Sequence, residues 1–251
     1  MRASVASVAV PWRSLSLGLV AVGSGLLAAV ALGVLTPWPV VAAGFGYLLG
    51  AGVIGARWHR SRFGAANTVT LARVVGCCWV GALTVEAALG GLTTGDRLLM
   101  IGVATGCVIL DGVDGWVARA RSEVSAFGAR FDMETDAVLL LCLCLAVPIL
   151  GVAGWWVLAL SGMRYGYLAV SHIFPALRIR LPVDYARKVV AVIAVLAPIA
   201  ALTIDLAWPG WPAGVILWVG LACLIWSFAR DIVWQIRVAR SGTPLPFPHL
   251  G

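Results

Sequence analysis

The chain alternates between long apolar runs and short polar or basic segments. Eight runs have the length of a membrane-spanning helix, which needs about 20 mostly apolar residues. These runs lie at 14–35, 39–56, 68–89, 97–118, 129–150, 155–174, 189–204 and 213–229. The seventh run is short, so its ends are the hardest to place. The pattern predicts an all-α protein with eight transmembrane helices.

Composition agrees with a polytopic helical membrane protein. Hydrophobic residues make up 61% of the 251 residues, and charged residues make up only 12%. A soluble domain of this length needs more polar surface than that to cover its core. The runs are also too long and too uniform for the alternating strands of an outer-membrane barrel. The six cysteines all lie in apolar runs without the spacing of a zinc site, so we expect buried free thiols.

The first apolar run follows Arg2 and Arg13, as the core of a signal peptide would. It is longer than such a core, and a second run follows at once, so we expect an uncleaved helix. Residues 1–62 are then an N-terminal segment with two helices, and 63–240 form a six-helix core. The proline-rich residues 241–251 are expected to be an irregular tail.

Basic residues gather on one side of this topology. If the N-terminus lies in the cytoplasm, the connecting segments on the non-cytoplasmic side contain only one basic residue, Arg97. The cytoplasmic segments hold Arg57, Arg60, Arg62, Arg119, Arg121, Arg178, Arg180, Arg187, Lys188, Arg230, Arg237 and Arg240. The asymmetry follows the positive-inside rule and explains the net charge of +7 without a nucleic-acid partner. We therefore expect a multi-pass protein of the cell (inner) membrane, with basic rims facing anionic headgroups.

Acidic residues cluster where the fourth and fifth runs meet. Asp111 and Asp114 are three residues apart, and on a helix they share one face. Asp132 and Asp136 are four apart and share a face in the same way. The polar segment RARSEVSA between them predicts a cytoplasmic turn, so the four carboxylates would face one another across antiparallel helices. Glu134 is off that face and is expected to pair with a nearby arginine.

Four carboxylates held together in a membrane need an opposing charge. Divalent cations are the simplest source of that charge, and all-oxygen ligands suit Mg²⁺ or Mn²⁺, here two ions. The alternative is pairing of the acids with Arg119, Arg121 and Arg130. Pairing is disfavoured because the acids share their faces with glycines, which leave room for a ligand near the backbone.

This acidic run resembles the signature of the CDP-alcohol phosphatidyltransferase family, D-x-x-D-G-x-x-A-R-x8-G-x3-D-x3-D. Every fixed position is filled here, by Asp111, Asp114, Gly115, Ala118, Arg119, Gly128, Asp132 and Asp136. A weaker upstream match, ANTVTLAR, is similar to the family's Asn-x-x-Thr-x-x-Arg and places Asn67, Thr70 and Arg73 beside the site. The family usually has proline where this chain has Ala66. The resemblance covers 67–240, and packing or dimer contact is expected of the first two helices.

The resemblance implies a transferase of phospholipid biosynthesis, in which an alcohol displaces CMP from a CDP-linked lipid such as CDP-diacylglycerol. Asp111, Asp114 and Asp132 are the implied metal ligands. Asp136 is the implied general base and a further ligand. A single displacement is expected, because the signature holds no Ser, Cys or His to form a covalent intermediate. A homodimer is implied by the resemblance alone.

Two sets of residues are expected around the cytidine nucleotide of the donor. A narrow floor without bulky side chains is expected from Gly115, Ala118 and Gly128. Contacts with the phosphates or the base edge are expected from Asn67, Thr70 and Arg119.

A basic pocket is expected for the acceptor. Arg164 lies inside the sixth run, where an unpaired charge is costly. Together with Arg130, Arg187 and Lys188 it predicts a cytoplasmic pocket for an acceptor with its own phosphate, such as glycerol 3-phosphate or inositol phosphate. For Arg187 and Lys188 the alternative is snorkelling to lipid headgroups.

Three other classes of protein are alternatives to the transferase. Intramembrane prenyltransferases carry acids in two distant loops, whereas these acids lie on one hairpin. An intramembrane divalent-cation transporter explains buried acids, but it does not need Gly115, Ala118 and Gly128 at fixed spacing. A scaffold protein needs none of the signature. Release of CMP, as opposed to metal flux into liposomes, separates the transferase from the transporter.

Overall fold

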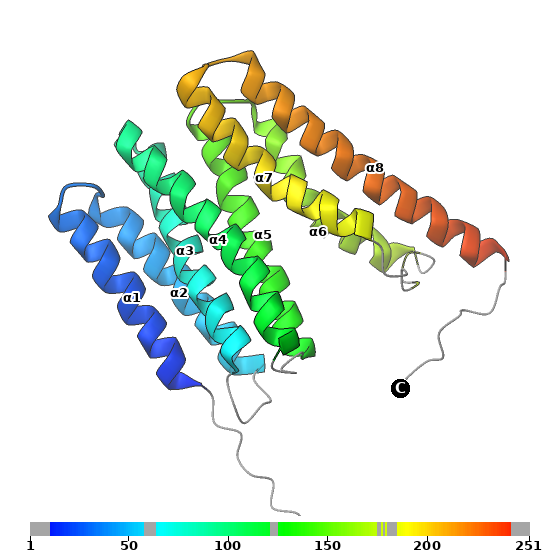
Figure 1. The fold of residues 1–251 in the computed structure, drawn as a ribbon, viewed down its shortest axis with the longest axis horizontal. Coiled ribbons are helices and arrows are strands. Elements are labelled where there is room, and N and C mark those ends of the chain that lie inside the picture. Colours follow the sequence, from blue (N-terminus) through cyan, green and yellow to red (C-terminus); the bar gives the residue numbers. More distant parts are fainter. Residues whose placement is uncertain are drawn as a thin grey trace, which may run out of the picture.

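The computed structural model describes residues 11–57, 64–120, 125–174, 177, 179 and 185–241, without the side chains of 53, 56, 57, 66, 114–120, 126 and 241. Within these ranges the chain forms helices and no strand (Figure 1). The helices are α1 (Trp12–Ala31), α2 (Pro37–Arg57), α3 (Ala65–Ala88), α4 (Thr94–Ala120), α5 (Ala126–Ile149), η1 (Trp155–Val157), α6 (Leu158–Ile173), α7 (Tyr185–Ala207) and α8 (Trp211–Ser241). The prediction of an all-α polytopic fold is confirmed for this part of the chain.

Each predicted apolar run coincides with one α-helix. Among the described residues, four helices are long and apolar enough to cross a membrane by length and composition: Trp12–Ala31, Asn67–Ala88, Tyr185–Ala207 and Trp211–Arg240. The helix α6 has only 16 residues. The helix α5 carries three acidic residues in its N-terminal half. The three acidic residues of the candidate site therefore make α5 less apolar than a typical membrane-spanning helix.

The predicted end of the eighth helix was wrong. The apolar run stops at residue 229, whereas α8 continues to Ser241. Arg230 and Asp231 end the apolar run, but neither residue breaks a helix. No glycine or proline occurs from 221 to 241, so nothing in the sequence stops the helix before Gly242.

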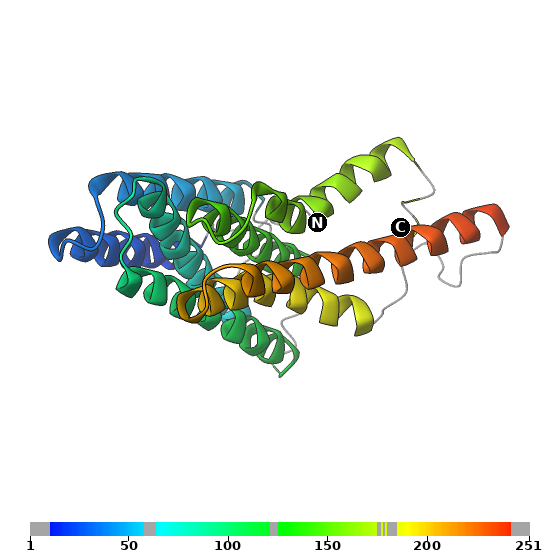
Figure 2. The same ribbon diagram turned by 90° about the horizontal axis from the view of Figure 1, so that it is seen from above.

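The helix α3 is the centre of the N-terminal half of the bundle, where it packs against α1, α2, α4 and α5. The helix α7 packs against α8, α5 and α4. In Figure 2, α6 (yellow-green) diverges from α8 (orange to red) toward the C-terminal ends of both helices. The six cysteines are free and fully or partly buried, as predicted.

Helix ends alternate between two sides of the bundle. The end of α4, the start of α5, the end of α6 and the start of α7 lie on the same side as the C-terminal end of α8 (Figure 1). We call this side the basic end, because Arg187, Lys188, Arg230, Arg237 and Arg240 belong to it.

Buried hydrogen bonds connect the two N-terminal helices to α3 and to each other. The amide and hydroxyl of Thr36 both donate to Glu86 Oε2 of α3, at 2.7 and 2.8 Å. Glu86 is only 2% exposed. The Tyr47 hydroxyl of α2 donates to the Leu15 carbonyl of α1 at 2.7 Å. The first two helices therefore pack on the core, as expected.

The opposite end of the bundle holds one ion pair between α4 and α7. Arg97 Nη2 lies 2.9 Å from Asp205 Oδ2, and both side chains are largely buried. The same nitrogen donates to the Leu202 carbonyl at 2.8 Å. This pair explains why a basic residue is tolerated on the side that is otherwise free of them in the predicted topology.

Candidate active site

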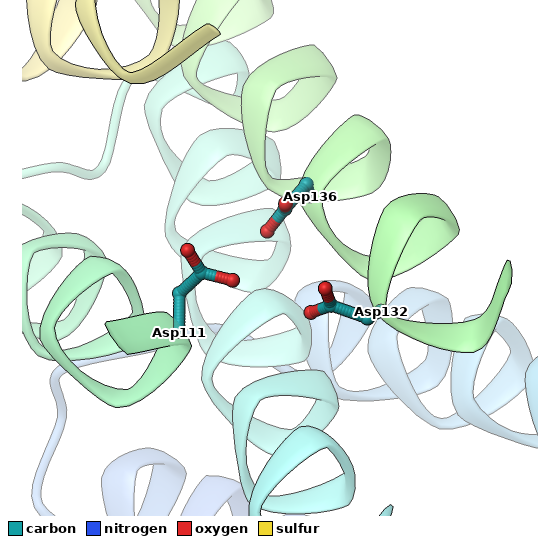
Figure 3. Close-up of side chains that lie close together, drawn as sticks. All are labelled: Asp111, Asp132 and Asp136. Atoms are coloured by element: carbon teal, nitrogen blue, oxygen red, sulfur yellow. The ribbon is translucent and has the colours of Figure 1, made fainter. Parts of the chain in front are cut away.

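Three aspartates from two neighbouring helices converge near the basic end. Asp111 comes from α4, and Asp132 and Asp136 come from α5 (Figure 3). Each offers a carboxylate oxygen, and the three oxygens lie within 4.8 Å of one another. Their side chains are between 37% and 42% exposed. The predicted facing of the α4 and α5 acids is therefore present for these three residues.

The guanidinium of Arg73 lies among these carboxylates. Arg73 is on α3 and only 1% exposed. Its Nη1 lies 3.0 Å from Asp111 Oδ1 and also pairs with Asp132. Its Nη2 pairs with Asp136. The acids are thus paired with Arg73. Of the three arginines expected as alternative partners, Arg130 makes no ion pair with them, and the side chains of Arg119 and Arg121 are outside the described part of the chain.

Arg73 offsets only one of the three negative charges. A net charge of minus two remains if all three carboxylates are ionised, and like charges this close oppose ionisation. One divalent cation would balance the remainder. Carboxylate oxygens are the ligands that Mg²⁺ and Mn²⁺ prefer, and three of them converge here on a half-buried spot. The residues present therefore fit a divalent metal ion.

The start of α5 is built for close contact with α3. The hydroxyl of Ser125 accepts a hydrogen bond from the Gly128 amide at 3.0 Å and caps the helix. A Cβ at Gly128 would lie 3.0 Å from Asn67 Oδ1 and from Ser125 Oγ. Glycine thus lets α3 approach α5 at this point. Asn67 and Thr70 are both buried on α3, about two turns and one turn before Arg73, respectively.

Several predicted residues have side chains outside the described part. The backbone of α4 includes Asp114, Gly115, Ala118 and Arg119, but their side chains are not described. Of the basic residues behind the predicted orientation, those that lie outside the described residues are Arg60, Arg62, Arg121, Arg178 and Arg180, and the same holds for the tail from residue 242. Their expected roles stay predictions.

A cavity of about 750 Å³ opens beside the aspartates, between α4, α5, α6, α7 and α8. Asp111, Asp132 and Asp136 all line it. Its volume falls within the range usual for small-molecule sites. Most of its other walls are apolar side chains of α5, α7 and α8. The cavity therefore joins the acidic cluster to space for a substrate.

Three of the four predicted acceptor residues line the same cavity, namely Arg164, Arg187 and Lys188. Arg164 Nη2 lies 2.8 Å from Glu134 Oε1, which confirms that Glu134 pairs with a nearby arginine. Arg164 Nη1 donates to the Met133 carbonyl at 2.9 Å. These contacts hold the Arg164 head against α5, at Met133 and Glu134, which lie between Asp132 and Asp136 in the sequence.

Arg130 is not brought together with the other three basic residues. It lines a separate groove between α2, α3 and α5. Arg130 precedes Asp132 by two residues, and a helix turns by about 100° per residue, so the two side chains leave α5 on different faces.

Sequence reasoning missed Asp231 and found Arg73 only in part. The resemblance places Arg73 beside the site, but it does not predict a position among the three carboxylates. A charge nine residues into α3 was the available signal, because such a charge must find a partner in a membrane. Asp231 lines the cavity and lies 3.7 Å from Arg187 Nη1. It was missed because the predicted eighth helix ended two residues earlier.

Fold and site together define a polytopic helical membrane protein with a carboxylate cluster, fit for a divalent metal, beside a substrate-sized cavity. Residues 63–226 match the family model described as CDP-alcohol phosphatidyltransferase. The match covers more than half of the chain, so the chain belongs to this family. The matched region begins after α2 and includes all residues of the candidate site apart from those at the end of α8.

One relative shows a strong local likeness. Over 33 residues the chain is 61% identical to CDP-diacylglycerol–inositol 3-phosphatidyltransferase 1 of Arabidopsis thaliana. The aligned stretch is 13% of this chain and 14% of that protein, far less than two thirds of the relative's length. No solved structure was found to match the chain.

Proposed function

We propose that this protein transfers the phosphatidyl group of CDP-diacylglycerol to the hydroxyl of a small alcohol and releases CMP. The observation that carries the proposal is the convergence of Asp111, Asp132 and Asp136 beside a cavity, in a chain of this family. The Arabidopsis relative, whose name describes such a transfer, supports it.

The aspartates are proposed to have two roles in the reaction, metal binding and proton transfer. Asp111, Asp114 and Asp132, with Asp136 as a further ligand, would hold Mg²⁺ or Mn²⁺. A bound ion would stabilise the negative charge that builds on the donor's pyrophosphate as its bridging bond breaks. Asp136 takes the proton of the acceptor hydroxyl while the hydroxyl oxygen forms a bond to the phosphorus of the phosphatidyl group. The bond to the CMP phosphate breaks in the same displacement, and CMP leaves with the electron pair.

The donor nucleotide is proposed to lie against α3 and the α4–α5 junction. Gly115, Ala118 and Gly128 would form its floor. Asn67, Thr70 and Arg119 would contact its phosphates or base. The close approach of α3 to α5 at Gly128 supports this placement, because it brings Asn67 to the start of α5.

The acceptor is proposed to be a phosphorylated polyol, such as glycerol 3-phosphate or inositol phosphate. Arg164, Arg187 and Lys188 line the cavity that the aspartates share, and guanidinium and ammonium groups bind phosphate strongly. The inositol in the relative's name supports a polyol. Arg130 is left out of this pocket, because it lies in the groove between α2, α3 and α5.

The protein is proposed to work as a homodimer in the cell (inner) membrane, with the site toward the cytoplasm. Family membership supports the dimer, and the basic end beside the aspartates supports the orientation. Light scattering of the purified protein tests the dimer. Labelling of a cysteine introduced at the end of α8, in sealed cells, tests the orientation.

The direct test is to incubate purified protein with CDP-diacylglycerol, Mg²⁺ or Mn²⁺ and a panel of alcohols, and then to identify the lipid product. We expect CMP and one phosphatidyl-polyol phosphate. Absence of CMP with every acceptor, together with Mn²⁺ flux into liposomes that hold the protein, would favour the divalent-cation transporter instead.

A further inference from the structure

A second hollow lies on the other face of α5 from the aspartates, between α2, α3 and α5. It has a volume of about 900 Å³, and we call it the α2–α5 groove. Its walls are mostly small or apolar. Gly46 and Gly50 of α2 line it, and a Cβ on either glycine would meet no atom within 4 Å. The groove is therefore open space beside a bare stretch of helix backbone.

Charge is confined to one end of the groove. Arg130 and Glu134 are its only charged lining residues among those described, and both lie in the N-terminal part of α5 at the basic end. Glu134 already accepts hydrogen bonds from Arg164 at 2.8 Å and from the Tyr165 hydroxyl at 3.2 Å. Arg130 is exposed and makes no ion pair with any described carboxylate. The groove thus offers one free guanidinium at its polar end.

The uncharged part of the groove matches one leaflet of a bilayer in length. The lining along α5 runs from Phe127 to Leu145, and the part beyond the charged residues, from Glu134 to Leu145, covers eleven residues, or about 16 Å on a helix. The hydrocarbon of one leaflet is about 15 Å deep, half of a bilayer core. A groove with a cation at the headgroup level and apolar walls over the depth of one leaflet is complementary to a phospholipid in charge and in apolar length. A transmembrane helix from a second copy would need apolar contact over the full core of about 30 Å.

We propose that the α2–α5 groove binds one phospholipid with an anionic headgroup. Its phosphate contacts Arg130, and an acyl chain lies along Gly46 and Gly50. This lipid is separate from the donor, because α5 stands between the groove and the cavity of the aspartates. The helix α2 lies before the region matched by the family model, so the wall that completes the site comes from the additional helices of this chain. The inference does not depend on the proposed reaction.

The test is lipid retention by the purified full chain, measured by native mass spectrometry after exchange with vesicles of equal phosphatidylglycerol and phosphatidylcholine. We expect one retained phosphatidylglycerol per chain. Gly46→Leu and Gly50→Leu fill the groove and should lower retention at least tenfold. The matched controls are Gly44→Leu and Gly52→Leu, which also meet open space on α2 but do not line the groove. Both controls should retain lipid as the unaltered protein does.

Arg130→Gln tests the headgroup contact without filling the groove. Arg130 is exposed, so this variant should fold, and it should lose the preference for phosphatidylglycerol over phosphatidylcholine. Retention in the two groove variants equal to that in their controls would overturn the proposal. So would a change from dimer to monomer in those variants with retained lipid unchanged, which would assign the groove to a second copy. Failure of CMP release in every protein would contradict the reaction and leave the lipid result standing.

Discussion

Arg73 combines two tasks that the sequence alone did not connect. It is a charge inside an apolar helix, which needs partners, and it reaches three carboxylates that also need partners. Because it supplies one positive charge to three acids, it assembles the cluster without neutralising it. Arg73 therefore holds the aspartates close together and leaves negative charge that a metal ion could balance.

Replacing Arg73 by glutamine tests this double role. Removal of one partner from a buried charge network costs about 3–5 kcal/mol, so the melting temperature should fall clearly. The remaining acids then carry one more uncompensated charge, so Mn²⁺ should raise the melting temperature of the variant more than that of the unaltered protein. Arg73→Lys keeps the charge and serves as the control. An unchanged melting temperature with no added effect of Mn²⁺ would contradict the assignment.

Asp136→Asn tests the general base. The amide keeps the shape of the side chain but does not accept a proton, so kcat should fall by a factor of about 10² or more. The affinity for CDP-diacylglycerol should change little, as equilibrium binding of a fluorescent analogue would measure. Asp96→Asn is the matched control, because Asp96 only caps the start of α4 through Thr93. Retained turnover in the Asp136 variant would remove the base from the mechanism.

Arg164→Gln tests the acceptor pocket. Loss of one charge-assisted contact with the acceptor phosphate should raise the KM for the acceptor about tenfold, equivalent to about 1.4 kcal/mol. The KM for CDP-diacylglycerol should stay the same, because the nucleotide is proposed to lie against α3. Arg97→Gln, at the far end of the bundle, is the control for loss of an arginine. An equal rise in both KM values would count against the pocket.

Among the elements, the lengths of the apolar runs were enough to locate the eight α-helices of the described residues. The apolar runs did not predict where each helix ends. The run at 213–229 ends where the apolar residues end, whereas α8 continues to Ser241, the last residue of this part that the structure describes. The helix α5 shows a second limit of sequence reasoning. The spacing of Asp132 and Asp136 predicts that they share one face of α5. That the other face of α5 borders a groove with α2 depends on how the neighbouring helices pack.

The docking of α1 and α2 rests on Glu86, which leads to a prediction for these helices. Glu86→Gln keeps the shape but removes the charge that both Thr36 donors contact, so the free energy of unfolding should fall by about 1–3 kcal/mol. Thermal unfolding in detergent measures the loss, and Thr36→Val should give a smaller one. The KM values should not change, because this contact lies at the opposite end of the bundle from the aspartates. A variant as stable as the unaltered protein would show that the contact contributes nothing.

Across the whole bundle, the acidic cluster could be predicted from the sequence, but the residues that surround the cluster could not. The motif places Asp111, Asp132 and Asp136 together because short-range helix geometry governs them. Arg73 precedes Asp111 by 38 positions and comes from another helix, so its place among the acids depends on how α3 packs. Arg130 shows the same limit, since proximity in sequence to Asp132 suggested a shared pocket that the helix rotation does not allow.

Carboxylates from α4 and α5 are proposed to bind a divalent cation together at this site. The most direct measurement is titration of Mn²⁺ into purified protein, followed by electron paramagnetic resonance, for the unaltered chain, Asp111→Ala and Asp132→Asn. We predict saturable Mn²⁺ binding that weakens at least tenfold in each variant, since each aspartate supplies a ligand from a different helix. Mn²⁺ binding of equal strength in all three proteins, or no saturable binding in any, would contradict the claim.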